Sequence, residues 1–536
     1  MTDLPHERDP VPAGSRFVLS AFGEQWRWLP LALVVWLAAV GFMMVPLVRP
    51  AVLVGPDSFY HVAISGRMAE QGLVLHEYPW VTESTWVERY FDKEWLFHVI
   101  LAPVSGPGAV LGPKLVILAL NGLIALAFWR LCLAVGVRRP LLWALALPFV
   151  AGPLMVFRLS VVRPQVFSFL WLFLVMAAMF RRRGWLVAVF TAIYSLSHAS
   201  HWVVPAMVLA YDVLYGLLED DGRRRARIQW LPRMTLWAVG GFVLGTLIHP
   251  QFPHNVSGLW LQNVEVLSSY WSAANDLQGL RPRELAPLGI WTLIYCAPLV
   301  VATAALAPWA WTRRARLDRT TAVLLIFGAG YTVLAVRSMR FVDYSAPFWL
   351  LLLAAVVARI GLPEFRAGRL LGILAAGAFG LFAVYHYAAY WKTYPVGWAA
   401  QWDDRQRYTL AGDWLRENLT PGDIVFTTNW DDPPILFYHA PQQRYLVFLD
   451  PMFMYKHDPA RFRLWRAVSE GREANAAQIM RHEFGAAVLF TRGRGRLDAQ
   501  LRATPGIDRV HMGMGGETIW LLRDPGPAPA AVEVAP

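Results

Sequence analysis

A succession of apolar runs, each about 17–25 residues long, occupies the larger N-terminal part of this chain. An α-helix of that length crosses the hydrocarbon core of a bilayer, and a soluble core does not need many such runs in succession. Hydrophobic residues make up 56% of the 536 residues and charged residues only 16%, which is too little polarity for a soluble protein of this size. The pattern therefore predicts a polytopic α-helical membrane protein.

Hydropathy along the chain predicts about eleven membrane spans, with boundaries that are good to a few residues. They cover roughly residues 28–48, 108–129, 141–157, 164–180, 185–197, 202–218, 235–249, 287–311, 320–336, 342–358 and 369–391. The transmembrane region is thus assigned to residues 1–391, and a long first loop covers residues 51–107 within it.

The distribution of arginine and lysine predicts the orientation of these spans. Basic clusters, such as the arginines at 181–183 and 223–225, recur in every second loop. By the positive-inside rule those loops are cytoplasmic, which places the N-terminus in the cytoplasm and everything after about residue 392 outside. This asymmetry also accounts for the formal net charge of +11, so we expect no nucleic-acid partner.

The segment after residue 391 changes character and becomes charged, with short alternating elements. This alternation predicts a small extracytoplasmic α/β domain over residues 392–524. Its predicted helices cover residues 405–419 and 459–483, and its predicted strands cover residues 424–428, 445–450, 486–491 and 518–523. The Pro- and Ala-rich tail over residues 525–536 is predicted to be disordered.

Carboxylates collect in the first outer loop. Asp57 directly follows the first apolar run, and Asp92 and Glu94 precede the second. A carboxylate at the end of a membrane span is energetically costly unless it interacts with water, a metal ion or another partner. Carboxylate oxygens are preferred ligands of Mg²⁺ and Mn²⁺. We predict that Asp57, Glu94 and Asp92 are catalytic and that Asp57 and Glu94 bind a divalent cation. A solvated acidic loop is the alternative, and we expect it for the central glutamates Glu70, Glu77, Glu83 and Glu88.

Histidines and arginines gather on the same predicted face. His198 is a candidate metal ligand, and His61 and His201 are candidate substrate contacts, although such histidines often serve only as structural hydrogen-bonding groups. Arginines on the outer face run against the positive-inside rule, so their presence there suggests a function. Guanidinium groups bind phosphate oxygens well. Arg340 and Arg337, with Tyr344 nearby, are predicted to bind substrate phosphate, and Arg158 and Arg163 bracket a short outer turn. The alternative is pairing with lipid headgroups or with Asp343.

Two residues of the C-terminal region complete the candidate site. Trp430 and Asp431 follow the predicted strand at 424–428. Ligands of open α/β sheets gather at the carboxyl ends of strands, so both residues are predicted to contact substrate. An ordinary Asp-Pro turn is the alternative.

Two stretches carry a resemblance to a known superfold. Residues 55–61 read Gly-Pro-Asp-Ser-Phe-Tyr-His and residues 92–98 read Asp-Lys-Glu-Trp-Leu-Phe-His. A first span, an Asp-aromatic motif and a long outer loop ending in acidic-Trp-Leu resemble the GT-C superfold of membrane glycosyltransferases. The resemblance implies a multi-pass enzyme of the bacterial cytoplasmic membrane, surrounded by membrane lipids. It also implies a polyprenyl-(pyro)phosphate-linked sugar as donor and a glycan, lipid or protein as acceptor at the outer face.

Within this superfold the stretch at 57–61, Asp-Ser-Phe-Tyr-His, is similar to the first acidic motif of the catalytic subunits of oligosaccharyltransferases. Their first acidic motif implies a metal-binding or catalytic role for Asp57, and Glu265 stands where they keep a loop glutamate, which makes it a fourth candidate metal ligand. The stretch at 430–432 resembles part of their Trp-Trp-Asp-Tyr-Gly motif, but the second Trp, the Tyr and the Gly are missing.

Two other functions remain open from the sequence. A transporter or flippase for a lipid-linked or anionic solute would place polar residues in the middle of its spans, whereas most spans here are apolar throughout. A non-catalytic scaffold for envelope polysaccharide assembly would keep the fold, but its acidic loop would bind no metal.

Overall fold

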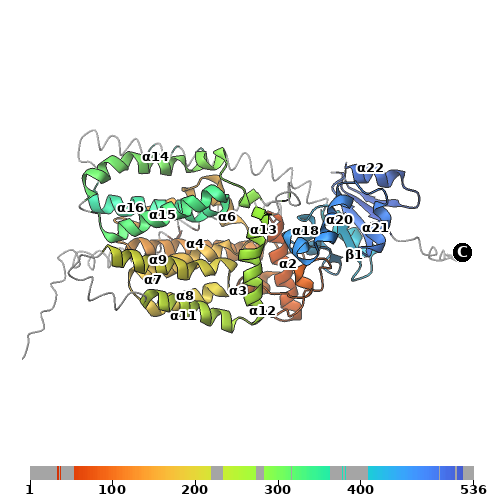
Figure 1. Cartoon of the computed structure of the whole chain (residues 1–536), viewed down its shortest axis with the longest axis horizontal. Helices are drawn as coiled ribbons and strands as arrows, with labels where there is room; N and C mark the ends of the chain where they lie inside the picture. Colours follow the sequence, from red (N-terminus) through yellow and green to blue (C-terminus); the bar gives the residue numbers. More distant parts are fainter. Residues whose placement is uncertain are drawn as a thin grey trace, which may run out of the picture.

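The computed structural model describes residues 53–218, 233–272, 283–314, 317–361, 408–493, 495–513 and 516–522, together with a few isolated positions. The predicted spans at 28–48 and 369–391 lie outside the described residues apart from isolated positions, and the predicted tail at 525–536 lies outside them entirely. The described part consists of a helical region up to residue 361 and an α/β region from residue 408 (Figure 1).

Within the described residues, four helices are long and apolar enough to cross a membrane, or five if one bent pair counts as a single span. The four are α4 (Leu111–Ala134), α14 (Ile290–Thr312), α15 (Arg319–Arg337) and the stretch Met339–Ile360, which contains α16 (Val342–Ile360). Figure 1 shows α4, α15 and α16 running side by side. The sequence thus correctly predicts a mostly helical protein with apolar helices of membrane length, and the described helices do not by themselves establish eleven spans.

The predicted span at 141–157 is a bent pair of helices rather than one straight helix. The chain forms α5 (Pro140–Ala146) with a short 3₁₀ extension, then turns by 93° into α6 (Pro153–Ser160). Gly152 precedes α6 with φ of 52°, a backbone conformation that glycine adopts without steric cost. Proline then begins the new helix, where it loses no hydrogen bond.

Shorter apolar helices fill the rest of the bundle at the positions where spans are predicted. They are α7 (Gln165–Phe180), α8 (Gly184–Ser195), α9 (Val203–Leu217) and α11 (Arg233–Ile248). Helices α8 and α11 approach closely through Gly241 and Gly245, because a Cβ atom at Gly241 would lie 2.2 Å from the carbonyl oxygen of Ala188. Small residues at such contacts are typical of helices that associate within a membrane.

The predicted first loop is largely folded. It contains α2 (Pro56–Gln71), a 3₁₀ turn (Thr85–Val87) and α3 (Trp95–Leu101). Gly55 with φ of 77° and Pro56 in the first turn start α2 immediately after the first apolar run. Figure 1 shows α2 at the end of the helical region, beside the α/β region.

The C-terminal region contains a five-stranded sheet in the order β2-β1-β3-β5-β4. Strand β1 pairs in parallel with β2 and β3, and β5 pairs antiparallel with β3 and β4. The strands are β1 (Ile424–Thr427), β2 (Arg444–Tyr445), β3 (Ala486–Thr491), β4 (Asp508–Met512) and β5 (Thr518–Leu521). The helices are residues 408–418, α18 (Asp432–His439), α19 (Met452–His457), α20 (Pro459–Ser469), α21 (Ala476–His482) and α22 (Arg496–Ala503).

Several details of this region differ from the sequence prediction, which also lacks helices α18, α19 and α22. The strand predicted at 445–450 pairs only over Arg444–Tyr445, and strand β4 is not predicted at all. The helix predicted at 459–483 is two helices, because the chain turns at Gly471 with φ of 66°. A Cβ atom there would lie 2.7 Å from the backbone nitrogen of Leu497, so the turn requires glycine.

The first loop extends the C-terminal sheet beyond β2. The backbone N–H of Tyr445 donates to the carbonyl of Trp80 over 2.8 Å, and the N–H of Thr82 donates to the carbonyl of Tyr445 over 2.9 Å. Glu83 is buried and accepts two hydrogen bonds from Arg461, over 2.8 and 2.7 Å. The prediction that Glu83 is solvated is therefore wrong, because this carboxylate joins the loop to the C-terminal region.

Candidate functional site

Three guanidinium groups surround the carboxylate of Glu284, which lies in a short 3₁₀ turn before α14. Arg158 Nη1 is 2.9 Å from Oε2 of Glu284, Arg163 Nη1 is 3.8 Å from the same oxygen, and Arg340 Nη2 is 3.4 Å from Oε1. Burial opposes the charge on Glu284, but Arg340, Arg163 and Arg158 outweigh burial and hold the pKa of this carboxyl well below its usual range. Glu284 is therefore a carboxylate anion that is surrounded by three arginine side chains.

Asp57 joins this group through Arg163. It lies in the first turn of α2, where the helix dipole favours a carboxylate, and it forms an ion pair with the guanidinium of Arg163. Ser58 holds the two segments together, because its hydroxyl accepts a hydrogen bond of 3.2 Å from the backbone N–H of Val162. The backbone contact thus places Arg163 beside Asp57.

Arg158 and Asp343 form the buried side of the group. The Arg158 side chain is 5% exposed, and its Nε lies 3.0 Å from Oδ2 of Asp343 in the first turn of α16. We call Asp57, Arg158, Arg163, Glu284, Arg340 and Asp343 the charged cluster. Its members come from α2, α6, the turn after α6, the 3₁₀ turn before α14, the 3₁₀ turn between α15 and α16, and the first turn of α16.

The two predicted phosphate-binding arginines have different surroundings. Arg340 lies in the 3₁₀ turn Met339–Phe341, and its side chain is 36% exposed. Its ion pair within the described residues is the 3.4 Å contact with Glu284, which leaves most of its five N–H groups available for a ligand. Arg337 ends α15 and is exposed, and among the described residues it makes no ion pair with the charged cluster.

A chain of hydrogen-bonded hydroxyl groups connects Tyr344 to His198. Tyr344 shares a hydrogen bond with Ser168, whose hydroxyl lies 2.6 Å from that of Tyr194. The chain continues through Ser200, 2.7 Å from Tyr194, to Nδ1 of His198 over another 2.7 Å. Burial, and then the positive charge of Arg340, lowers the pKa of His198, so this imidazole is neutral at pH 7.

Asp92, His98 and His61 form a second buried chain of hydrogen bonds. His98 Nδ1 donates to Oδ2 of Asp92 over 2.7 Å, and His61 Nδ1 lies 2.8 Å from Nε2 of His98. Where Nε2 of His98 accepts in this contact, His61 donates through Nδ1 and keeps Nε2 as an acceptor. His61 lies one helical turn after Asp57 on the same face of α2, so the chain ends next to the charged cluster.

The other predicted site residues lie in different surroundings. Glu94 is buried and 3.6 Å from the ammonium of Lys93, and burial raises its pKa. His201 is buried, with Nδ1 3.0 Å from the carbonyl oxygen of His198. Asp431, next to Trp430 at the start of α18, lies 3.5 Å from Arg492 and makes no ion pair with the charged cluster in the part of the chain that is described.

The predicted metal ligands are not brought together. Among the described residues, no three His, Cys, Asp or Glu side chains are placed to hold a metal ion. Each predicted ligand has another partner: Asp57 pairs with Arg163, Glu94 with Lys93, Glu265 with Lys456 and His198 with Ser200. The four predicted ligands thus lie in separate pairs among the described residues, and a Mg²⁺ or Mn²⁺ site stays a prediction.

The structure adds residues that the sequence analysis did not select. Glu284 lies in a segment predicted as an outer loop over residues 249–286, which is in fact partly helical, with α12 (His254–Trp260), a π-helical turn (Leu261–Glu265) and α13 (Val266–Ser272). The signal that indicates Glu284 is its place directly before a predicted span, in a protein with several arginines on the same face. His98 also lacks a predicted role, although it follows Asp92 by six residues.

The arrangement of the chain is that of the GT-C fold of membrane glycosyltransferases, which confirms the resemblance seen in the sequence. The archaeal oligosaccharyltransferase AglB from Archaeoglobus fulgidus, solved with an inhibitory peptide and a dolichol-phosphate, matches with a TM-score of 0.59 at 13% identity, over 87% of this chain and 69% of AglB. ArnT from Cupriavidus metallidurans, bound to undecaprenyl phosphate, matches with a TM-score of 0.52 at 15% identity, over 95% of this chain and 100% of ArnT. No family model and no curated protein matches the sequence.

Proposed function

We propose that this protein transfers a sugar from a polyprenyl-(pyro)phosphate carrier to an acceptor at the outer face of a bacterial cytoplasmic membrane. The observation that carries the proposal is the charged cluster, in which three arginines converge beside Asp57 within a GT-C fold. Structural neighbours that bind dolichol-phosphate and undecaprenyl phosphate support this choice of donor. In this proposal the N-terminus is cytoplasmic, and the charged cluster and the C-terminal region face outward.

Arg340 is the residue that we assign to the donor phosphate. It is the most exposed guanidinium of the charged cluster, whereas Arg158 is 5% and Arg163 is 17% exposed. Guanidinium groups bind phosphate oxygens through paired charge-assisted hydrogen bonds. Tyr344 and His198, through their hydroxyl chain, and the exposed Arg337 would contact the carrier and the neighbouring lipid headgroups.

Asp57 is the residue that we assign to the acceptor. The acceptor hydroxyl attacks the anomeric carbon of the sugar, the bond from that carbon to the phosphate oxygen breaks, and the hydroxyl proton passes to Asp57. The departing phosphate carries away the bonding electrons, and Arg340 stabilises its charge. Arg163 holds Asp57 in place through their ion pair. No step is assigned to a divalent cation.

The remaining predicted residues would act around this centre. Asp92, with Glu94 beside it, orients His61 through His98, and a neutral His61 offers Nε2 to a sugar hydroxyl. Burial, and then the nearby His98, lowers the pKa of His61, which keeps this imidazole neutral. Trp430, Asp431 and His201 are proposed to contact the acceptor or donor glycan at a greater distance from the reacting carbon.

The direct test is a donor assay with the purified protein in lipid nanodiscs. We expect at least one member of a panel of polyprenyl-phosphate and polyprenyl-pyrophosphate sugars to be consumed, with release of the free carrier phosphate detected by mass spectrometry. Carrier binding without consumption of any donor would instead indicate the non-catalytic scaffold. Movement of an intact labelled lipid across proteoliposomes would indicate the flippase.

The substitution Arg340→Ala tests the phosphate assignment. Loss of a charge-assisted hydrogen bond costs about 1.5–3 kcal/mol, so we expect undecaprenyl phosphate to bind roughly 10- to 100-fold more weakly. Equilibrium binding of radiolabelled undecaprenyl phosphate to nanodiscs measures this change. Arg89→Ala is the matched control, because it removes an exposed arginine of the first loop that lies outside the charged cluster and has no proposed role in carrier binding. Equal losses in the two variants would show general attraction of a lipid anion and contradict the assignment.

A further inference from the structure

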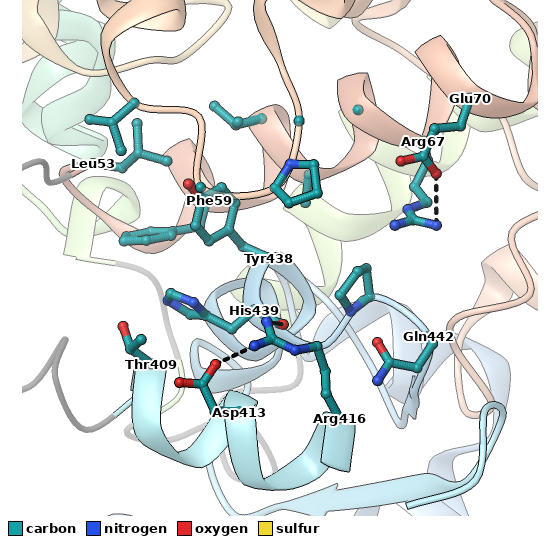
Figure 2. A pocket seen from close by; sticks show the side chains of 18 of the residues that line it. Leu53, Phe59, Arg67, Glu70, Thr409, Asp413, Arg416, Tyr438, His439 and Gln442 are labelled. Atoms are coloured by element: carbon teal, nitrogen blue, oxygen red, sulfur yellow. Dashed lines mark hydrogen bonds and ion pairs between the residues drawn. The ribbon is translucent and has the colours of Figure 1, made fainter.

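A cavity lies on the side of α2 that faces away from the charged cluster. It has a volume of about 690 Å³ and is bounded by α2, the connection before α4, the helix at 408–418 and the end of α18 (Figure 2). It is lined by the face of α2 that carries Phe59, Ala63 and Arg67, whereas Asp57 and His61 point to the opposite face of this helix. The cavity is therefore separate from the charged cluster.

Two ion pairs form the charged part of the cavity lining, and Thr409, His439 and Gln442 add further polar groups. Arg67 Nη1 lies 3.0 Å from Oε2 of Glu70, and Arg416 pairs with Asp413 on the opposite wall (Figure 2). Arg416 also donates a hydrogen bond of 2.8 Å to the carbonyl of His439. Because each guanidinium has its own carboxylate, the walls carry no net charge from these four residues, and they present donors and acceptors side by side. A sugar hydroxyl is both a donor and an acceptor and matches such pairs.

Aromatic and aliphatic side chains form the rest of the lining. The rings of Phe59 and Tyr438 meet edge to face with centroids 5.3 Å apart, and both side chains are largely buried. Leu53 lies beside them, at the end of the cavity away from Arg67 in Figure 2. Aromatic groups suit the C–H faces of a sugar ring as well as other apolar surfaces. The volume lies within the range of small-ligand sites, which combine an apolar wall with a few polar groups.

We propose that this cavity is a binding site for an uncharged saccharide. An anionic ligand would approach Glu70 and Asp413 as closely as the two arginines, so the paired lining gives it no net attraction. A wholly apolar ligand would bury these charges and the amide of Gln442 without hydrogen bonds, which is costly. A neutral sugar can form hydrogen bonds with the ion pairs on both walls and can also pack against the aromatic side chains. This conclusion does not depend on the transfer reaction proposed above.

The test is saccharide binding to the full-length protein in nanodiscs free of glycoside detergents, because such detergents carry the proposed ligand as their headgroup. The probes are maltose, cellobiose, lactose and chitobiose, followed by saturation-transfer difference NMR. We expect saturable binding of at least one of them at millimolar concentration. Ala63→Phe, which fills the cavity from α2, should weaken this binding about tenfold or more.

Ala69→Phe is the matched control, since Ala69 is exposed on the same helix and does not line the cavity. It should bind the saccharide as the unmodified protein does, and Ala63→Phe should still bind undecaprenyl phosphate normally. If Ala63→Phe does not fold, Gln442→Ala replaces it and should also weaken binding. The proposal is overturned if none of the four disaccharides binds, if glucose 1-phosphate binds better than all of them, or if the cavity variants bind as well as Ala69→Phe.

Discussion

Replacing Asp57 with asparagine is expected to lower the turnover number for sugar transfer by about 10²–10⁴-fold, the usual contribution of a general base. Asparagine keeps the shape of the side chain but cannot take the proton of the acceptor hydroxyl. The affinity for the carrier phosphate should change little, because Arg340 and not Asp57 is assigned to it. Release of the carrier phosphate from the donor identified in the panel assay measures turnover, and the carrier binding assay measures affinity.

Glu88→Gln provides the control for this substitution. Glu88 is an exposed carboxylate of the same loop, at the end of the 3₁₀ turn Thr85–Val87, so its removal changes the loop charge equally and leaves the cluster intact. We expect normal turnover for Glu88→Gln. If Asp57→Asn retained a turnover within a factor of a few of that of the control, Asp57 would have no role in proton transfer.

Replacing Arg158 with methionine is expected to have the largest effect on stability. The Arg158 guanidinium is almost fully buried and neutralises Asp343, whose side chain is 3% exposed, as well as part of the charge on Glu284. Removing one partner of a buried ion pair leaves an uncompensated charge and costs about 3–5 kcal/mol. Unfolding of the purified protein in mixed micelles of increasing SDS content, followed by tryptophan fluorescence, measures this loss.

A double variant separates the ion pair from simple loss of packing. Arg158→Met combined with Asp343→Leu removes both charges, so we expect it to recover a large part of the lost stability. Arg337→Met is the control for loss of an exposed arginine and should change stability by less than about 0.5 kcal/mol. If the double variant were less stable than Arg158→Met alone, the Arg158–Asp343 pair would not account for the loss.

The fold can be predicted from the sequence more fully than the site can, and the reasons are physical. Apolar runs of fixed length and short strands with turn residues are local signals, and they correctly indicate α4, α7, α16, β1 and β3. The 93° turn before α6 arises from Gly152 and Pro153 and is hidden within a continuous apolar run. The edge strand β4 carries charged and exposed residues, which removes the hydrophobic pattern on which strand prediction depends.

A site residue can be predicted from the sequence only where its charge stands next to an apolar segment. Asp57 and Arg340 are charges at the ends of apolar segments, and both belong to the charged cluster. Asp92 also stands out, but its partner His98 depends on how the chain folds between the two. The place of Glu284 directly before a predicted span is a weak local signal, and its role depends on three arginines that approach it from distant segments.

The main-chain hydrogen bonds between residues 80–83 and β2 have a consequence for dividing this protein into parts. These bonds do not depend on which side chains the residues carry, unless proline removes a backbone N–H, and they join the helical region to the sheet. A chain shortened at residue 391 would leave Trp80 and its neighbours as an unpaired, apolar strip open to self-association. Exchange of the C-terminal region between related proteins must therefore carry the matching strip from the first loop with it.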